Sequence, residues 1–301
     1  MVKSSIFRYV TGLLVALFTV GLVSSQISAA DPEVRESITL SPTSVRVQLN
    51  PGESNSGELT VINDGETNYD FVVYTRPYSV ADSQYTPDFT SYRSNTDAYA
   101  WVRFDKVRYH LNPGESTKVP YTVQAPVKAS PGGHYGVIFV ETQPAADSSG
   151  GSSISRKKRV GALLYVTVKG EYNMKGSVVG VDVSPLQFRR PLVATLSVKN
   201  EGNSDFMTAV TYRVSDVFGN VKYESQKEYP IMPDTTRTIV LEWADSPWFG
   251  VYKVAVSTSL LNQQTTQDEK IVFVAPRWLL IFVAVLVMGG VGYAILRWRK
   301  K

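Results

Sequence analysis

Short runs of alternating apolar and polar residues, separated by turn residues, fill most of this chain and constrain its fold more than any other feature. Period-two alternation is typical of strands with one buried face. Turn residues recur about every 8–12 positions, a spacing typical of immunoglobulin-like β-sandwiches. Clear examples of such alternating runs are residues 45–49, 119–123, 194–198 and 210–214.

Two short repeats support this interpretation. The hexapeptide Leu-Asn-Pro-Gly-Glu-Ser occurs at 49–54 and at 111–116, and each copy predicts a tight turn before a strand. Residues 61–65 (VINDG) also resemble residues 198–202 (VKNEG). We therefore predict an all-β chain with two immunoglobulin-like β-sandwich domains in tandem.

The domain limits that we predict are 31–170 and 171–276. The polar, low-complexity segment 144–155 fits either a hairpin loop or a domain linker. We favour a hairpin loop, because the strand before it would otherwise lack its neighbour. Residues 80–100 are polar and irregular, and we predict a long exposed connection there.

An apolar run near the end of the chain, residues 278–296, contains no charged residue. As a helix it would be about 28 Å long, close to the ~30 Å hydrocarbon core of a bilayer. Four basic residues follow it, which favours a cytoplasmic end. We predict a transmembrane helix with a basic cytoplasmic tail over 277–301; the alternative is a buried core helix.

The start of the chain has the pattern of an export signal. Lys3 and Arg8 precede the apolar stretch 10–23, and small residues follow up to Ala30. We predict a signal peptide over 1–30; the alternative is a second membrane helix. Together the two ends predict a single-pass plasma-membrane protein at a bacterial cell surface, with 31–276 outside and the C-terminus in the cytoplasm.

Composition narrows the function. Seven of the 31 Lys and Arg residues lie in the two terminal segments, which leaves 24 basic against 27 acidic residues between them. This balance gives no reason to expect nucleic-acid binding. The chain has no Cys and two His, and it lacks zinc-protease, serine-hydrolase and phosphate-loop motifs. We expect a non-enzymatic protein with no catalytic residue, metal or cofactor.

Aromatic residues crowd the segment 85–109 beside hydrogen-bonding groups. This mixture suits sugar stacking and is also enriched at protein interfaces. The alternative is that these are ordinary loop residues, and we expect at least partial burial of Trp101. The binding residues that we predict are Tyr85, Phe89, Tyr92, Arg93 and Tyr99.

Several motifs in the first half carry a family resemblance. They are Ser41-Pro42, the turn 49–53, Val61-x-Asn63, Asp70-Phe71, the run 101–104, the turn 111–116 and the run 131–136. With the predicted signal, sandwiches and membrane helix, they resemble the WxL-interacting proteins of Gram-positive bacteria. The resemblance implies a first domain that binds peptidoglycan and a second that binds a host. It covers residues 38–140, and no ligand residues transfer position by position.

The expected function is therefore that of a non-enzymatic, membrane-anchored cell-surface protein. Its first sandwich would bind peptidoglycan or a wall-associated surface protein. The alternative is a chaperone-like or scaffold module that binds an exported protein by strand pairing. A passive stalk is a third possibility.

Overall fold

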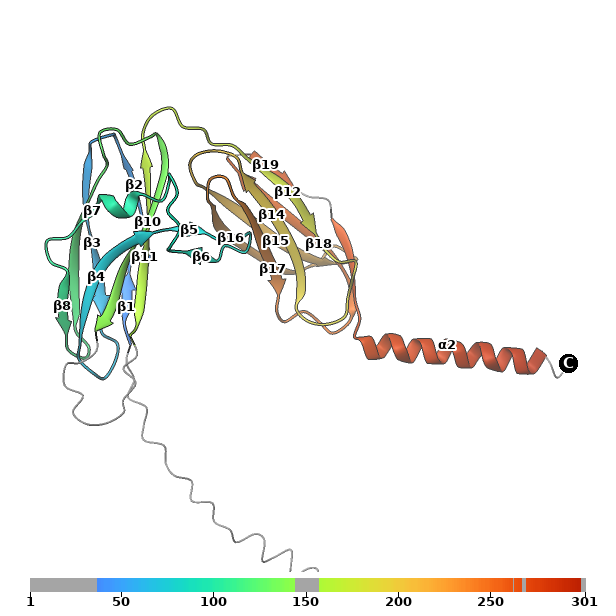
Figure 1. Cartoon of the computed structure of the whole chain (residues 1–301). Coiled ribbons are helices and arrows are strands. Elements are labelled where there is room, and N and C mark those ends of the chain that lie inside the picture. Colours follow the sequence, from blue (N-terminus) through green and yellow to red (C-terminus); the bar gives the residue numbers. More distant parts are fainter. Residues whose placement is uncertain (1–36, 144–156, 262, 267–268, 299–301) are drawn as a thin grey trace, which may run out of the picture.

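The computed structural model describes residues 37–143, 157–261, 263–266 and 269–298 (Figure 1). Most of these residues lie in β-strands that form two sandwiches, followed by one helix. The predicted all-β class is confirmed. The predicted domain limits, 31–170 and 171–276, remain predictions.

The first sandwich consists of two sheets, with strand orders β1-β3-β9-β7 and β2-β11-β10-β4-β8. Neighbouring strands pair antiparallel, except β2 and β11, which are parallel. The strands are β1 (Thr39–Ser41), β2 (Ser44–Leu49), β3 (Ser54–Ile62), β4 (Tyr69–Pro77), β7 (Val102–Arg103), β8 (Arg108–Leu111), β9 (Ser116–Gln124), β10 (Gly132–Gln143) and β11 (Arg159–Val168).

Strands β10 and β11 pair antiparallel from Gly132 opposite Val168 to Glu141 opposite Arg159. The strands on either side of 144–155 therefore form one hairpin, as predicted, rather than belonging to separate sheets. The predicted loop itself falls on 144–156, outside the described residues.

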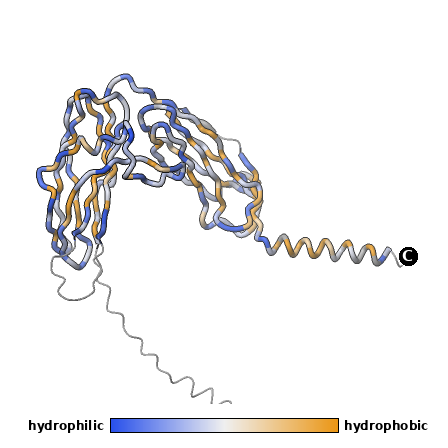
Figure 2. Tube along the Cα trace, viewed as in Figure 1, coloured by the Kyte–Doolittle hydropathy of each residue, from blue (hydrophilic) through white to orange (hydrophobic). Residues whose placement is uncertain are grey.

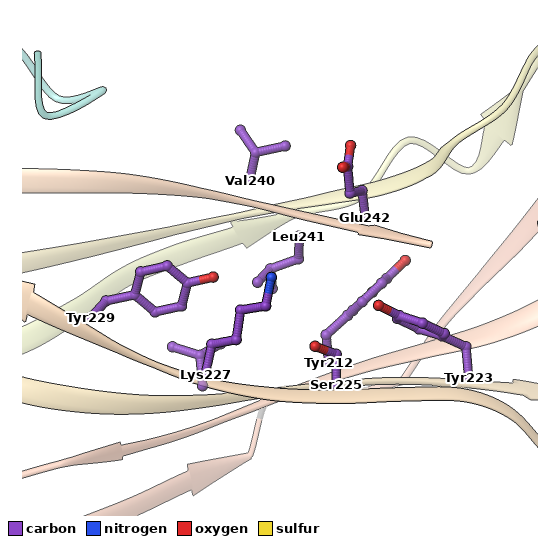
Figure 3. A pocket seen from close by; sticks show the side chains of 9 residues that line it. Tyr212, Tyr223, Ser225, Lys227, Tyr229, Val240, Leu241 and Glu242 are labelled. Atoms are coloured by element: carbon purple, nitrogen blue, oxygen red, sulfur yellow. The ribbon is translucent and has the colours of Figure 1, made fainter. Parts of the chain in front are cut away.

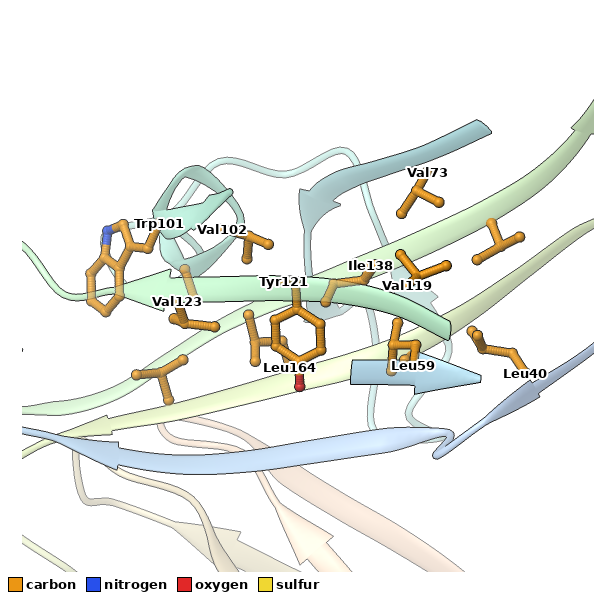
Figure 4. Close-up of a cluster of buried hydrophobic side chains, with 14 of the residues drawn as sticks. Leu40, Leu59, Val73, Trp101, Val102, Val119, Tyr121, Val123, Ile138 and Leu164 are labelled. Carbon is orange, nitrogen blue, oxygen red and sulfur yellow. The ribbon is translucent and has the colours of Figure 1, made fainter. Parts of the chain in front are cut away.

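The core of the first sandwich fills the space between its two sheets (Figure 4). Leu59 and Val119 come from one sheet and Ile138 and Leu164 from the other, and each is at most 1% exposed. Burying one such side chain fully contributes about 1.5–3 kcal/mol. Trp101, at the end of the short 3-10 helix η2 (Ala98–Trp101), is also buried, which confirms its predicted burial.

The second sandwich has the sheets β12-β14-β17 and β13-β20-β18-β15-β16, with β19 beside β18. Its core is apolar in the same way, with residues of both sheets meeting between the layers. The strands are β12 (Gly176–Asp182), β13 (Leu186–Gln187), β14 (Leu192–Asn200), β15 (Phe206–Asp216), β16 (Val221–Ile231), β17 (Thr236–Trp243), β18 (Gly250–Leu260), β19 (Gln263–Thr266) and β20 (Lys270–Val274).

The repeated hexapeptide forms the same turn twice. The Glu53 carboxylate accepts hydrogen bonds from the backbone and side-chain nitrogens of Asn50, both at 2.7 Å. Glu115 binds both nitrogens of Asn112 in the same way, at 3.0 Å. The glycine of each turn has a positive φ, 83° at Gly52 and 74° at Gly114, which explains the residue type there.

The chain beyond β20 forms a helix, α2 (Arg277–Trp298), whose residues are largely apolar and exposed (Figure 2). None of the helices in the described part of the chain combines the length and hydropathy that a bilayer span requires. The predicted membrane helix at 277–301, the single-pass plasma-membrane localisation and the orientation built on them are therefore wrong. The predicted signal peptide, 1–30, lies outside the described residues.

Candidate strand-binding groove

An extended segment between β4 and β7 of the first sandwich contacts the second sandwich. We call residues 78–100 the arm. It contains a small hairpin of β5 (Ser79–Val80) and β6 (Pro87–Asp88), and it reaches from the first sandwich toward the second (Figure 1). At its tip, the Ser83 carbonyl accepts a 2.7 Å hydrogen bond from the Thr238 N–H. The predicted exposed connection is thus partly buried, as Val80 and Ala98 are 4% and 0% exposed.

Two of the predicted binding residues pack inside the arm contact. The Tyr85 hydroxyl lies 2.7 Å from Thr235 Oγ1 and accepts a 2.7 Å hydrogen bond from the Met232 N–H. The Arg237 guanidinium lies over the Tyr85 ring, 4.3 Å from its centroid. The Phe89 ring meets Phe139 edge-on at 5.0 Å. Both aromatic rings are therefore engaged within the protein.

The other three predicted residues lie closer to the surface. Tyr92 is 68% exposed, and its ring meets that of Tyr99 edge-on at 5.8 Å. Arg93 is exposed beside them, and its backbone N–H donates to Thr96 Oγ1. The structure thus brings Tyr92 and Tyr99 together near the surface, whereas Tyr85 and Phe89 pack against the rest of the protein. Ligand binding by these five residues remains a prediction.

Sequence reasoning missed the polar residues that join the two sandwiches. The Tyr135 hydroxyl donates to Asp205 Oδ1 at 3.0 Å and accepts from the Asp205 N–H at 2.9 Å. Arg46 forms an ion pair with the same carboxylate and lies over the Tyr165 ring. Burial raises the pKa of Tyr135 far above its ordinary value, so this hydroxyl stays protonated and keeps donating.

A sequence signal for this contact exists in β10. Residues 135–140 (YGVIFV) hold no charged or hydrogen-bonding residue other than the tyrosine, so they do not alternate in polarity. A continuous apolar strand indicates burial on both faces. One face of β10 packs into the core, and the other carries Tyr135, Val137 and Phe139 under the arm and Met232.

The sheets leave several strand edges unpaired, and β17 forms one of them. Strand β16 is an edge that carries Pro230 and several charges, and β12 is interrupted by a bulge at Val178 and Gly180. Proline, charge and bulges are the devices that protect sheet edges from further pairing. Strand β17 has eight residues, of which Arg237 and Glu242 are charged, and it has no proline, glycine or bulge. In the described chain no strand pairs with its outer side.

One hydrogen bond shows which backbone groups of β17 point away from its neighbour β14. Because the Thr238 N–H donates to Ser83 rather than to β14, it points away from the sheet. Backbone groups alternate sides along a strand, so those of Val240 and Glu242 point the same way. Val240 is 52% exposed. The arm therefore occupies the Thr238 position of this edge, and the next two outward positions, Val240 and Glu242, pair with no strand of the described chain.

A groove of about 230 Å³ lies between this edge and β16 (Figure 3). Its walls combine three tyrosine rings with edge backbone and two opposite charges. Arg237 lies at one side, where it donates to the Pro230 carbonyl at 2.8 Å and lies over the Tyr229 ring. The side chains that line the groove include those of Tyr212, Tyr223, Lys227, Tyr229, Val240 and Glu242.

The tyrosine rings are held in place by the sandwich. The Tyr212 hydroxyl donates to the Leu192 carbonyl at 3.2 Å, and burial raises its pKa. The Tyr223 ring stacks on Trp243 at 5.8 Å with an interplanar angle of 11°. The groove thus offers rigid apolar walls beside free backbone groups. Such a site fits an extended polypeptide better than a reaction centre, and no three His, Cys, Asp or Glu in the described residues gather to hold a metal.

Comparisons with known proteins give structural matches only. No family model matches the chain, and no curated protein matches it. The solved structures that it is similar to include the class 5 fimbriae chaperone CfaA, at 14% identity over 78% of this chain and 99% of that one, with a TM-score of 0.40. The E. coli chaperone DraB matches at 14% identity over 78% and 97%, with a TM-score of 0.36. No function is transferred from matches at these scores.

These findings correct the family resemblance. The assignment to the WxL-interacting proteins is wrong, because no model of that or any other family matches the chain. The membrane-anchored cell-surface function and the peptidoglycan or wall-associated partner are wrong with it. Sugar stacking needs exposed rings, and two of the rings predicted to stack, Tyr85 and Phe89, are packed against the protein.

Proposed function

We propose that this chain is a non-enzymatic, chaperone-like or scaffold module that binds an extended segment of another protein by strand pairing. The segment would add to the outer edge of β17 and lie along the groove beside β16. The observation that carries the proposal is the hydrogen bond between Ser83 and Thr238, beside the open positions of Val240 and Glu242. Strand addition to a sheet edge takes affinity from backbone groups and specificity from alternate side chains.

The test uses a phage-displayed library of random nine-residue peptides, selected on the immobilised full chain. Val240→Pro removes an outward N–H and should lower the yield of selected phage about tenfold, since losing edge hydrogen bonds costs about 1–2 kcal/mol. The matched control is Val179→Pro on β12, where the residue is 61% exposed and has no partner in the strand register.

Circular dichroism of both variants establishes that they are folded. The proposal expects Val179→Pro to select the same peptides as the original chain. If Val240→Pro also selects them with equal yield, the β17 edge is not the binding site and the proposal fails.

A further inference from the structure

The groove contains a cation, Lys227, that forms no ion pair with any residue the structure describes. Figure 3 shows the Lys227 side chain inside the groove, with its amino group between Tyr229 and Tyr212. Among the described residues, no carboxylate forms an ion pair with Lys227, whereas other cations of the same sheet are paired. Arg213 binds Glu224 at 2.9 Å, and Lys222 binds Asp216 at 3.2 Å.

Lys227 faces the space that a strand added to β17 would occupy. Lys227, Ser225 and Tyr223 alternate along β16 on the side that lines the groove. A strand added to β17 would also present every second side chain to this space. One inward side chain would then meet Lys227, and an inward neighbour two residues away would meet the half-buried Tyr223 ring, whose edge contact with Tyr212 holds it in place.

We infer that the bound segment carries an acidic residue facing Lys227, with a large apolar residue two positions away against the Tyr223 ring. This inference rests on the proposed function, because it specifies the segment that the β17 edge accepts. Opposite charges on neighbouring strands attract, and a lysine between aromatic rings favours a carboxylate over a second cation. The partner is thus a polypeptide with an acidic residue in an alternating apolar stretch.

The test compares peptides selected from the same random library on three folded forms of the full chain. On the original chain, Asp and Glu should be enriched roughly two- to fivefold at one position of the alternating pattern. Lys227→Glu should enrich Lys and Arg at that position instead. Lys128→Glu makes the same charge change in an exposed loop of the first sandwich and should leave the acidic preference unchanged.

The outcomes separate the two proposals. If selected peptides depend on Val240 but show no acidic preference, or keep it on Lys227→Glu, the inference about Lys227 is overturned while strand binding stands. If no selection depends on Val240, strand binding at β17 fails and the inference fails with it.

Discussion

Two buried asparagines hold equivalent turns in the two sandwiches. Asn63 donates to the Thr67 carbonyl at 2.8 Å and accepts from the Gly65 N–H at 3.0 Å. Asn200 donates to the Ser204 and Ile231 carbonyls, both at 2.9 Å, and accepts from the Gly202 N–H at 2.8 Å. Both side chains are fully buried. The sequence similarity of 61–65 and 198–202 therefore reflects a shared way to satisfy backbone groups at a strand end.

We predict that Asn200→Ala lowers the free energy of unfolding by about 1–3 kcal/mol, because two carbonyls and one N–H lose their partner in a buried site. Urea denaturation of the full chain measures the change. Asn55→Ala, an exposed position on β3, is the control and should change stability by less than about 0.5 kcal/mol. Equal effects of the two substitutions would contradict the role assigned to Asn200.

His134 is a buried charge-bearing residue, with a side chain only 3% exposed beneath Trp101. Its Nδ1 lies 2.6 Å from Asp97 Oδ1, and its Nε2 lies 2.8 Å from the Ser130 carbonyl. Both neighbours are acceptors, so the protonated ring satisfies both. Burial lowers the pKa of His134, but the Asp97 and Ser130 interactions outweigh it, and the pKa lies above its ordinary value.

This shift predicts a pH-dependent stability. A folded-state pKa above the unfolded value gives stability that is fully present below about pH 6.5 and is lost as pH rises through the folded-state pKa. Urea denaturation between about pH 5.5 and 8.5 should therefore show stability falling with pH. His134→Gln should remove most of this slope. His110→Gln should retain it, since His110 is exposed, although hydrogen bonding to Asp70 also raises its pKa. A slope unchanged in His134→Gln would contradict the assignment.

At the scale of elements, the arm is the segment whose structure is hardest to predict from the sequence. Alternation predicts strands such as β14 and β15 because each has one buried face and one exposed face. The arm lacks alternation, since its buried residues meet the outer face of β10 and the second sandwich rather than a sheet partner. The unpaired edge of β17 could not be predicted from the sequence either, because the local sequence of a strand does not determine which strands lie beside it.

Tyr85 is the residue that fixes the tip of the arm. We predict that Tyr85→Phe lowers the free energy of unfolding by about 1–2 kcal/mol, because it removes the bonds with Thr235 and Met232 but keeps the ring under Arg237. Urea denaturation gives the loss. Tyr92→Phe, at a ring that is 68% exposed, is the matched control and should have almost no effect. A loss as large in Tyr92→Phe would show that the arm is not anchored through the Tyr85 hydroxyl.

At the scale of the whole molecule, the arm and the Arg46, Tyr135 and Asp205 contacts join the two sandwiches into one packed unit. The same contacts place Ser83 on the edge of β17 and leave the rest of that edge open. The first sandwich thus helps to form the site on the second. This arrangement connects the fold to the proposed strand-binding function.

The most direct test is amide hydrogen exchange by NMR, residue by residue, on the full chain with and without a library-selected peptide. Added strands protect the backbone N–H groups that they bind. We predict that the Val240 and Glu242 amides exchange much more slowly with peptide, while Thr238, already bonded to Ser83, is protected in both states. Protection that appears along β2 or β12, with Val240 and Glu242 unchanged, would contradict the account.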